Sequence, residues 1–136
     1  MSGAGIVVSP AFHETMQRHV KAVAPTGSRA MCVPAPTDTD EDWIVLVDSL
    51  QDFGAAAMGD GWTGPAHPRD EEKYPDGFDT FRSGIINLIV TAQEDFYRRF
   101  DAATHVGRRL NLLSKDDRIA LFQAVLYGNK YDGASK

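Results

Sequence analysis

The segment DEDWIVLV, residues 40–47, is the strongest indication of how this 136-residue chain folds. Its apolar half, Trp43–Val47, is short, continuous and rich in β-branched and aromatic residues. That pattern predicts a strand buried on both faces, as at the centre of a sheet. Asp40 and Asp42 stand at the start of the strand. Alternate strand residues share a side, so their carboxylates should lie about 7 Å apart. The two charges repel unless a cation neutralises them, and Mg²⁺ favours such oxygen ligands.

Residues before this strand predict a helix and then a loop. Ser9 suits the N-cap of a helix and Pro10 its first position, and apolar residues follow at a four-residue spacing. We therefore expect a helix from Ser9 to about Val23, ended by Pro25. Residues 24–39 hold three prolines and a glycine, which predicts mostly loop and short turns.

Residues after this strand predict further helices and strands around a long loop. Ser49 can cap a helix that continues to about Met58, and the glycine- and proline-rich residues 59–77 predict one long loop. Two strands joined by a tight turn are expected at 78–82 and 85–91. A helical period then runs from Asp95 to Leu113, with a break near 103–105. A last helix is expected over 116–127, ended by Gly128. The prediction is an α+β fold, a small mixed sheet backed by helices, over residues 9–128, with a flexible lead at 1–8 and a polar tail at 129–136.

Composition narrows the classes of function. The length favours one domain. The 14 basic against 19 acidic residues give a net charge of −5, which disfavours broad coating of nucleic acid. Cys32 is the only cysteine, so no internal disulfide or multi-cysteine zinc site is expected. With no apolar run long enough to span a bilayer and no signal peptide, we expect a cytoplasmic protein without a membrane partner.

A second motif precedes the strand. It is Gly27-Ser28, and eleven residues separate Ser28 from Asp40. A Gly-Ser turn can direct backbone N–H groups and a hydroxyl at a phosphate. A phosphate-binding turn together with a metal-binding carboxylate pair is the minimal equipment for phosphoryl or nucleotidyl transfer.

These motifs resemble the DNA polymerase β-like nucleotidyltransferase superfamily. Three segments are especially similar to small uncharacterised nucleotidyltransferase-like proteins of tailed phages and some cells: GSRAMCVPAPTDTDEDWIVLV, FRSGIINLIVT and ATHVGRRLNLLSKDDRIALFQAVLYG. The resemblance covers roughly residues 10–128. The resemblance implies a minimal nucleotidyltransferase fold. It also implies transfer of a nucleoside monophosphate from an NTP to a hydroxyl group, with Mg²⁺ or Mn²⁺ held by two motif carboxylates and commonly a third on a later strand. For a phage protein, the expected location is the host cytoplasm.

The resemblance assigns roles to individual residues. Gly27 and Ser28 match the phosphate-binding turn, and Asp40 and Asp42 match the metal pair. The register Asp38/Asp40 also fits the spacing, so Asp38 is a further metal candidate; we prefer Asp40/Asp42 because the apolar strand follows at once. The position expected for the third carboxylate is Asn87, a neutral ligand and a poor general base. Asp38, Asp79 or another acid would then have to compensate.

The roles of the arginines and the identity of the acceptor remain open at this point. Arg29 and Arg82 could contact the triphosphate, or could be ordinary exposed residues. The arginine pairs at 98/99 and 108/109 predict a solvated helix face, with a nucleic-acid or protein contact as the alternative. The acceptor is expected to be a protein, a nucleic acid such as RNA, or a small molecule. No room remains for an acceptor domain, so the long loop, the C-terminal helices or a partner chain would bind it, and an oligomer is compatible with this.

Asn87 supports a second hypothesis for the function. In this alternative the chain is a catalytically degenerate nucleotidyltransferase-like module that binds a nucleotide or a host protein, as a phage accessory factor or an antitoxin-like partner.

Overall fold

A four-stranded mixed sheet organises the computed structural model, which describes residues 12–32, 40–64 and 78–134. The strands are β1 (Val20–Thr26), β2 (Glu41–Val47), β3 (Phe78–Ser83) and β4 (Ile86–Thr91). Their order is β1-β2-β4-β3; β2 pairs antiparallel with β1 and parallel with β4, and β3 pairs antiparallel with β4. The predicted α+β class with a small mixed sheet is therefore confirmed, and the apolar run that predicted a central strand lies within β2.

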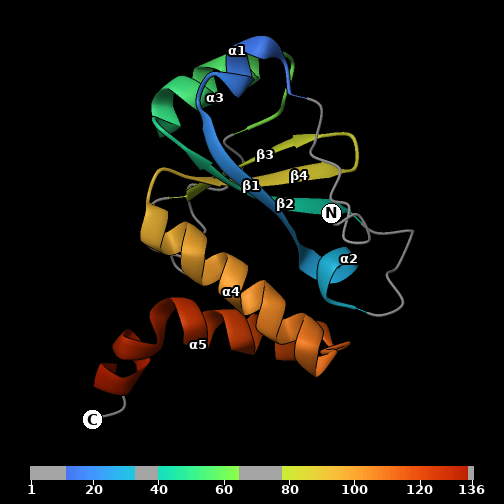
Figure 1. The fold of residues 1–136 in the computed structure, drawn as a ribbon, viewed down its shortest axis with the longest axis vertical. Coiled ribbons are helices and arrows are strands. Elements are labelled where there is room, and N and C mark those ends of the chain that lie inside the picture. Colours follow the sequence, from blue (N-terminus) through green and yellow to red (C-terminus); the bar gives the residue numbers. More distant parts are fainter. Residues whose placement is uncertain (1–11, 33–39, 65–77, 135–136) are drawn as a thin grey trace.

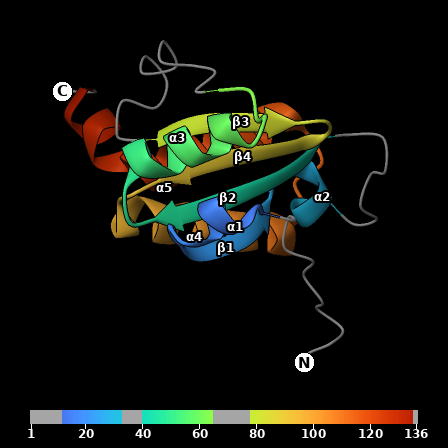
Figure 2. The same ribbon diagram turned by 90° about the horizontal axis from the view of Figure 1, so that it is seen from above.

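Helices cover both faces of this sheet (Figures 1 and 2). The helices are α1 (Glu14–Gln17), α2 (Gly27–Met31), α3 (Leu50–Gly59), α4 (Glu94–Leu110) and α5 (Lys115–Ala134). Side chains alternate along β2, so Trp43 and Val45 enter the core beneath α1 and α3, whereas Ile44 enters the core beneath α4 and α5. None of the helices within the described residues has the length and apolar character that crossing a bilayer requires.

The helix predicted from Ser9 to Val23 is confirmed only at residues 14–17 of its described part, and its extension to Val23 is wrong. The chain forms one helical turn, α1, and then strand β1. Phe12, Met16 and Val20 do share one core, as their spacing suggested, but from a lead segment, a helix turn and a strand. Pairing of Val20 with Val47 outweighed the local helical pattern. Pro25 fits within β1 because an edge strand leaves one side of its backbone unpaired.

The loop predicted over 24–39 is also wrong where the structure describes it. Residues 24–26 complete β1, and α2 begins directly at Gly27. Residues 33–39 lie outside the described part of the chain, as do the expected cap at 9–10, most of the long loop, and residues 135–136.

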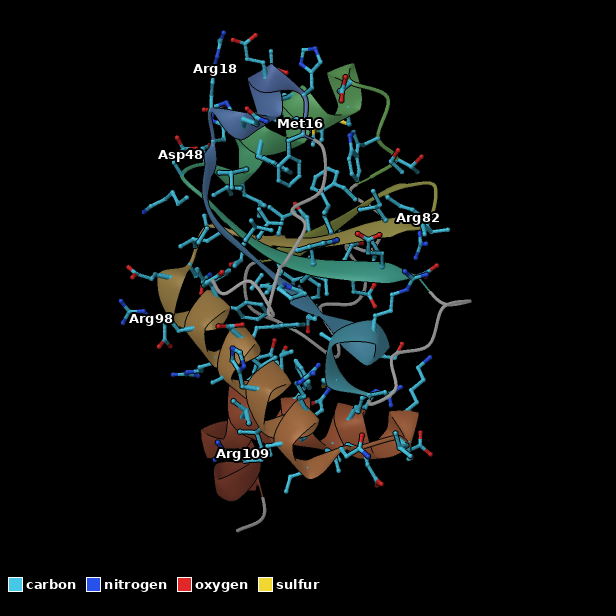
Figure 3. All side chains as sticks on the ribbon, turned by 45° about the vertical axis from the view of Figure 1, so that its right-hand side comes forward. Met16, Arg18, Asp48, Arg82, Arg98 and Arg109 are labelled. Carbon is cyan, nitrogen blue, oxygen red and sulfur yellow. The ribbon has the colours of Figure 1, made fainter. Side chains whose placement is uncertain are left out.

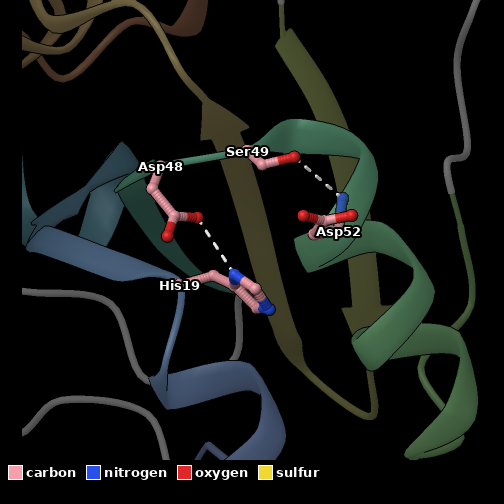
Figure 4. A network of polar contacts seen from close by, with 4 residues as sticks. All are labelled: His19, Asp48, Ser49 and Asp52. Carbon is pink, nitrogen blue, oxygen red and sulfur yellow. Dashed lines mark hydrogen bonds and ion pairs between the residues drawn. The ribbon is translucent and has the colours of Figure 1, made fainter.

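The later elements agree with the sequence, with two differences. Ser49 caps α3 as expected, its Oγ accepting a hydrogen bond from the Asp52 backbone N–H at 3.1 Å (Figure 4). The break expected near 103–105 is absent, and α4 is one continuous helix. The last helix leaves helical angles at Tyr127 (φ −131°, ψ 20°) and then continues to Ala134, past the end expected at Gly128.

Close packing holds α2 against α4. A Cβ on Gly107 would lie 2.5 Å from the Met31 Sδ, so with a larger residue either the Met31 side chain or one of the two helices would have to move. The Arg108 guanidinium donates to the Ala30 carbonyl at 2.9 Å, and the buried hydroxyls of Thr26 and Thr104 are 2.7 Å apart. These contacts fix where α2 begins relative to the sheet.

Candidate functional site

One row of residues crosses the sheet at the end where β2 begins. Thr26 pairs with Asp42, Asp42 with Asn87, and Asn87 with Arg82. Paired residues share a face of a sheet, and Asp42 and Asn87 alternate with residues of the opposite core, so this row faces α4 and α5. Figure 3 shows Arg82 at this end of the sheet, with Asp48 at the other. Residues from four strands are thus brought together at one edge.

Asp42 is the central acid of this row. The Asn87 side-chain amide donates to Asp42 Oδ1 at 3.0 Å, and both residues are half-buried. Loss of hydration raises the pKa of Asp42, and the charge of Asp40 raises it further. The Asn87 hydrogen bond and the charges of Arg82 and Arg29 act in the opposite direction. The charged form of Asp42 is therefore disfavoured unless another cation approaches.

Gly27 brings the backbone of α2 against this acid. Its φ is +74°, a conformation that residues with a Cβ rarely adopt. A Cβ at this position would also collide with the carboxylate of Asp42, Oδ2 first. Both facts require glycine, and the consequence is a backbone turn packed directly on the Asp42 carboxylate.

Asp40 and Arg82 form an ion pair at the rim. The Arg82 guanidinium donates to Asp40 Oδ2 at 2.9 Å, and both side chains are about half exposed. That hydrogen bond is the main cause that lowers the pKa of Asp40, and the charges of Arg82 and Arg29 add to it. The two carboxylates are therefore different: one is ionised and paired, and the other is half-buried and harder to ionise.

Arg82→Gln should raise the pKa of Asp40 towards its ordinary value, because the main stabiliser of the carboxylate is removed. An NMR titration of the aspartate carboxyl signals measures this shift. Arg98→Gln is the matched control, since Arg98 pairs with Glu94 on the exposed face of α4. An Asp40 pKa that does not move in Arg82→Gln would show that the ion pair is not formed in solution.

A pocket of about 440 Å³ gathers most of the expected residues. Gly27, Ser28, Asp40, Asp42 and Asn87 all line it. Arg82 reaches it through Asp40, and Arg29 acts on both carboxyls through its charge.

Two further acids were candidates to replace the missing third carboxylate. Asp79 pairs with Val90, which lies in the core beneath α1 and α3, so it is on the opposite face from Asp42 and cannot compensate. Asp38 lies outside the described residues. The structure therefore places the Asp40/Asp42 pair at the pocket but does not compare it with the Asp38/Asp40 pair.

The sequence interpretation missed the second wall of the pocket. Four residues of α5 line it, at the spacing i, i+3, i+4 and i+7 of one helix face: Lys115, Arg118, Ile119 and Phe122. Met31, Ile89 and Phe100 complete the apolar part. The helical spacing was visible in the sequence, but only the fold shows that this face of α5 lies opposite Asp42.

The side-chain oxygen atoms at this pocket supply some, but not all, of the ligands that a hard cation needs. Asp40, Asp42 and the Asn87 side-chain carbonyl offer oxygen ligands, the kind that Mg²⁺ prefers. Within the described ranges, no group of three or more His, Cys, Asp or Glu side chains could hold a metal ion. These residues fit a cation that takes one or two carboxylates from the protein and its remaining ligands from a substrate phosphate and water.

The four arginines of α4 are exposed, as the predicted solvated face requires, and Figure 3 labels two of them, Arg98 and Arg109. Some of the four also make contacts. Arg98 and Arg99 pair with Glu94 and Asp95, one turn earlier. Arg99 also donates to the Leu126 carbonyl at 3.0 Å, as Arg108 does to α2. Arg99 and Arg108 therefore connect α4 to its neighbours.

No protein-family model, curated protein or solved structure matches the chain.

Proposed function

We propose that this chain is a metal-dependent nucleotidyltransferase, which moves a nucleoside monophosphate from an NTP to a hydroxyl of a protein, a nucleic acid or a small molecule. The observation that carries the proposal is the contact between the Gly27 turn and the Asp42 carboxylate. It puts a candidate phosphate-binding backbone and a candidate metal ligand on one pocket, which Ser28, Asp40 and Asn87 also line.

Each residue has a role in this proposal. The backbone at Gly27 and the Ser28 hydroxyl would bind the β- and γ-phosphates, and Arg29 and Arg82 would offset their charge. Asp40 and Asp42 would hold Mg²⁺ or Mn²⁺, for which Asp40 must separate from Arg82. The bound cation would neutralise charge that develops on the phosphates. The acceptor oxygen would bond to the α-phosphorus while the bond from that phosphorus to the β-phosphate oxygen breaks. The hydroxyl proton would pass to water, and pyrophosphate would leave. A reducing cytoplasm, that of the host if a phage encodes the chain, is the proposed location.

Label transfer tests this activity. The purified chain is incubated with each α-labelled NTP, Mg²⁺ or Mn²⁺, and cell lysate as the source of acceptor. The proposal expects label on a protein, RNA or small molecule, and its loss in the Asp40→Ala/Asp42→Ala variant. No transfer with any NTP, together with no metal-dependent NTP binding, would contradict the proposal.

A second candidate function rests on one contact. Asn87 stands where the resemblance expects a third carboxylate, and its side-chain amide donates a hydrogen bond to Asp42 instead of offering a negative charge. That contact favours a binding module, which would hold a nucleotide or a host protein without turning the nucleotide over.

Asn87→Asp separates the two functions. A third carboxylate beside Asp42 should increase Mn²⁺ affinity about tenfold, because it replaces a neutral donor with a charged ligand. Mn²⁺ titration and the label-transfer assay measure the two effects. Gln93→Glu adds the same charge at an exposed position at the start of α4 and is the control.

The outcome of Asn87→Asp assigns the native protein. Transfer by the variant but not by the native chain would assign the binding function. Transfer by both chains would support the enzyme. Unchanged Mn²⁺ affinity in the variant would contradict a metal site at this row.

A further inference from the structure

The α5 wall gives the pocket a character that the carboxylate pair alone does not explain. The inner part of the pocket is apolar: Phe122 of α5 and Phe100 of α4 are almost completely buried, and Ile119 of α5 is 39% exposed. Its rim carries two cations, Lys115 and Arg118. A ligand that fills this pocket therefore needs an apolar face and a negative group.

The two cations of the wall differ in what they already contact. The Arg118 guanidinium donates to the Leu112 and Leu113 carbonyls at 2.9 and 2.8 Å and lies 3.4 Å from the Cys32 Sγ. It holds the α4–α5 turn beside the end of α2. The Lys115 side chain is exposed and has no hydrogen-bond or ion-pair partner within the part of the chain that the structure describes. Lys115 is thus the cation that can turn to a ligand.

The charges around the pocket favour an anion even without a metal ion. Two carboxylates line it, and each already has a polar partner, Arg82 for Asp40 and Asn87 for Asp42. Four cations act on it: Arg29 and Arg82 through the carboxylates, and Lys115 and Arg118 from α5. Among the described residues that line the pocket or act on its carboxylates, cations thus outnumber acids by four to two, although the chain carries a net charge of −5.

We propose that Lys115 and the apolar wall around Ile119 form a binding site for a nucleoside polyphosphate that needs no divalent cation. The polyphosphate lies between Lys115 and the Gly27-Ser28 turn, and the base packs on Ile119 and its apolar neighbours. The nucleotide class rests on the proposed function, but this binding does not require transfer. An apolar wall beside a cation suits the flat face of a base linked to a charged chain.

Calorimetric titration of the full chain in excess EDTA tests the role of Lys115. ATP, GTP, CTP and UTP are each titrated into the native chain, Lys115→Ala and Lys115→Arg. At least one NTP should bind, and Lys115→Ala should weaken that binding about tenfold, the usual effect of losing a charge-assisted contact. Lys115→Arg should retain most of the affinity. Lys21→Ala removes an equal charge from the far end of β1 and should bind like the native chain.

Inorganic tripolyphosphate tests the apolar wall in the same experiment. It should bind at least about tenfold more weakly than the NTP, because it has no base to bury. Ile119→Ser should weaken NTP binding but not tripolyphosphate binding. Val106→Ser is the matched control, since Val106 on α4 is similarly exposed (42%) and is not a residue of the pocket. Equal affinity for NTP and tripolyphosphate would overturn the assignment of the base to this wall.

The inference and the proposed function fail in different ways. NTP binding that appears only with Mg²⁺, or binding in EDTA that Lys115→Ala leaves unchanged, overturns the metal-independent site. Label transfer would still support the enzyme in that case. Binding in EDTA that depends on Lys115 supports the site even where no transfer is found.

Discussion

Asp42→Asn should lower the proposed nucleotidyl transfer by at least about 10³-fold, because it removes the charge of the half-buried proposed metal ligand and keeps its shape. The amide can still accept a hydrogen bond from Asn87 and still fits against Gly27. The loss therefore reports the missing charge and not a rearranged pocket. Initial rates of label transfer measure it, and Mn²⁺ titration should show weakened binding. Transfer within tenfold of the native rate would exclude Asp42 as the central acid.

The same variant should be more stable than the native chain at pH 7 in EDTA. Burial raises the pKa of Asp42 in the folded state above its unfolded value. A carboxyl of this kind stabilises the fold only while it is protonated, and that contribution is lost as the pH rises through its raised pKa. Asparagine avoids this cost. The difference in free energy of unfolding between Asp42→Asn and the native chain should therefore shrink as the pH falls through the pKa of Asp42.

Urea unfolding at several pH values measures this difference. Asp52→Asn is the control, because Asp52 is exposed in the first turn of α3 and its charge favours the helix. Asp52→Asn should be no more stable than the native chain. An Asp42→Asn variant that is less stable at every pH would show that the Asp42 charge is satisfied in the fold. Added Mn²⁺ should stabilise the native chain and have less effect on Asp42→Asn.

Gly27→Ala should lower the free energy of unfolding by about 2–3 kcal/mol, with both a positive φ and a collision contributing. The Cβ would meet the Asp42 carboxylate, so either α2 or Asp42 must shift. Either shift separates the turn from the acid. NTP affinity in the folded variant should therefore fall by about 100-fold, as expected when several polar contacts are lost.

Gly61→Ala separates strain from collision. Gly61 also has a positive φ, +89°, but a Cβ there would meet nothing within 4 Å. Its substitution should cost about 1 kcal/mol, from the backbone conformation alone, with no loss of NTP binding. Chemical unfolding and NTP titration measure both variants. Equal effects of Gly27→Ala and Gly61→Ala would show that the contact with Asp42 is unimportant.

Much of the sheet could be predicted because its strands carry their own signals. The β2 run and the hairpin of β3 and β4 are apolar, β-branched and bounded by turn residues, and all three lie where expected. Strand β1 was missed because its apolar residues continue the four-residue spacing of Phe12 and Met16. Only the pairing of Val20 with Val47 decides between helix and strand, and that partner lies 27 residues further along the chain.

The candidate site could be predicted only on its sheet side. Gly27, Ser28, Asp40 and Asp42 form a local motif, and the parallel pairing of β2 with β4 brings Asn87 to it. No local pattern says that Asp79 faces away or that Arg82 pairs with Asp40, because both depend on register. The α5 wall depends on how the last helix packs across the sheet, which its own periodicity does not specify.

The most direct test of the site is a crystal structure of the chain with Mn²⁺ and a non-hydrolysable NTP. Manganese can be located by its anomalous signal. We expect Mn²⁺ between Asp40 and Asp42, with Arg82 displaced from Asp40, the triphosphate on the Gly27-Ser28 turn and the base against the α5 wall. An NTP bound elsewhere on the chain, or no manganese at Asp42 with saturating ligand, would contradict the proposed nucleotidyltransferase site.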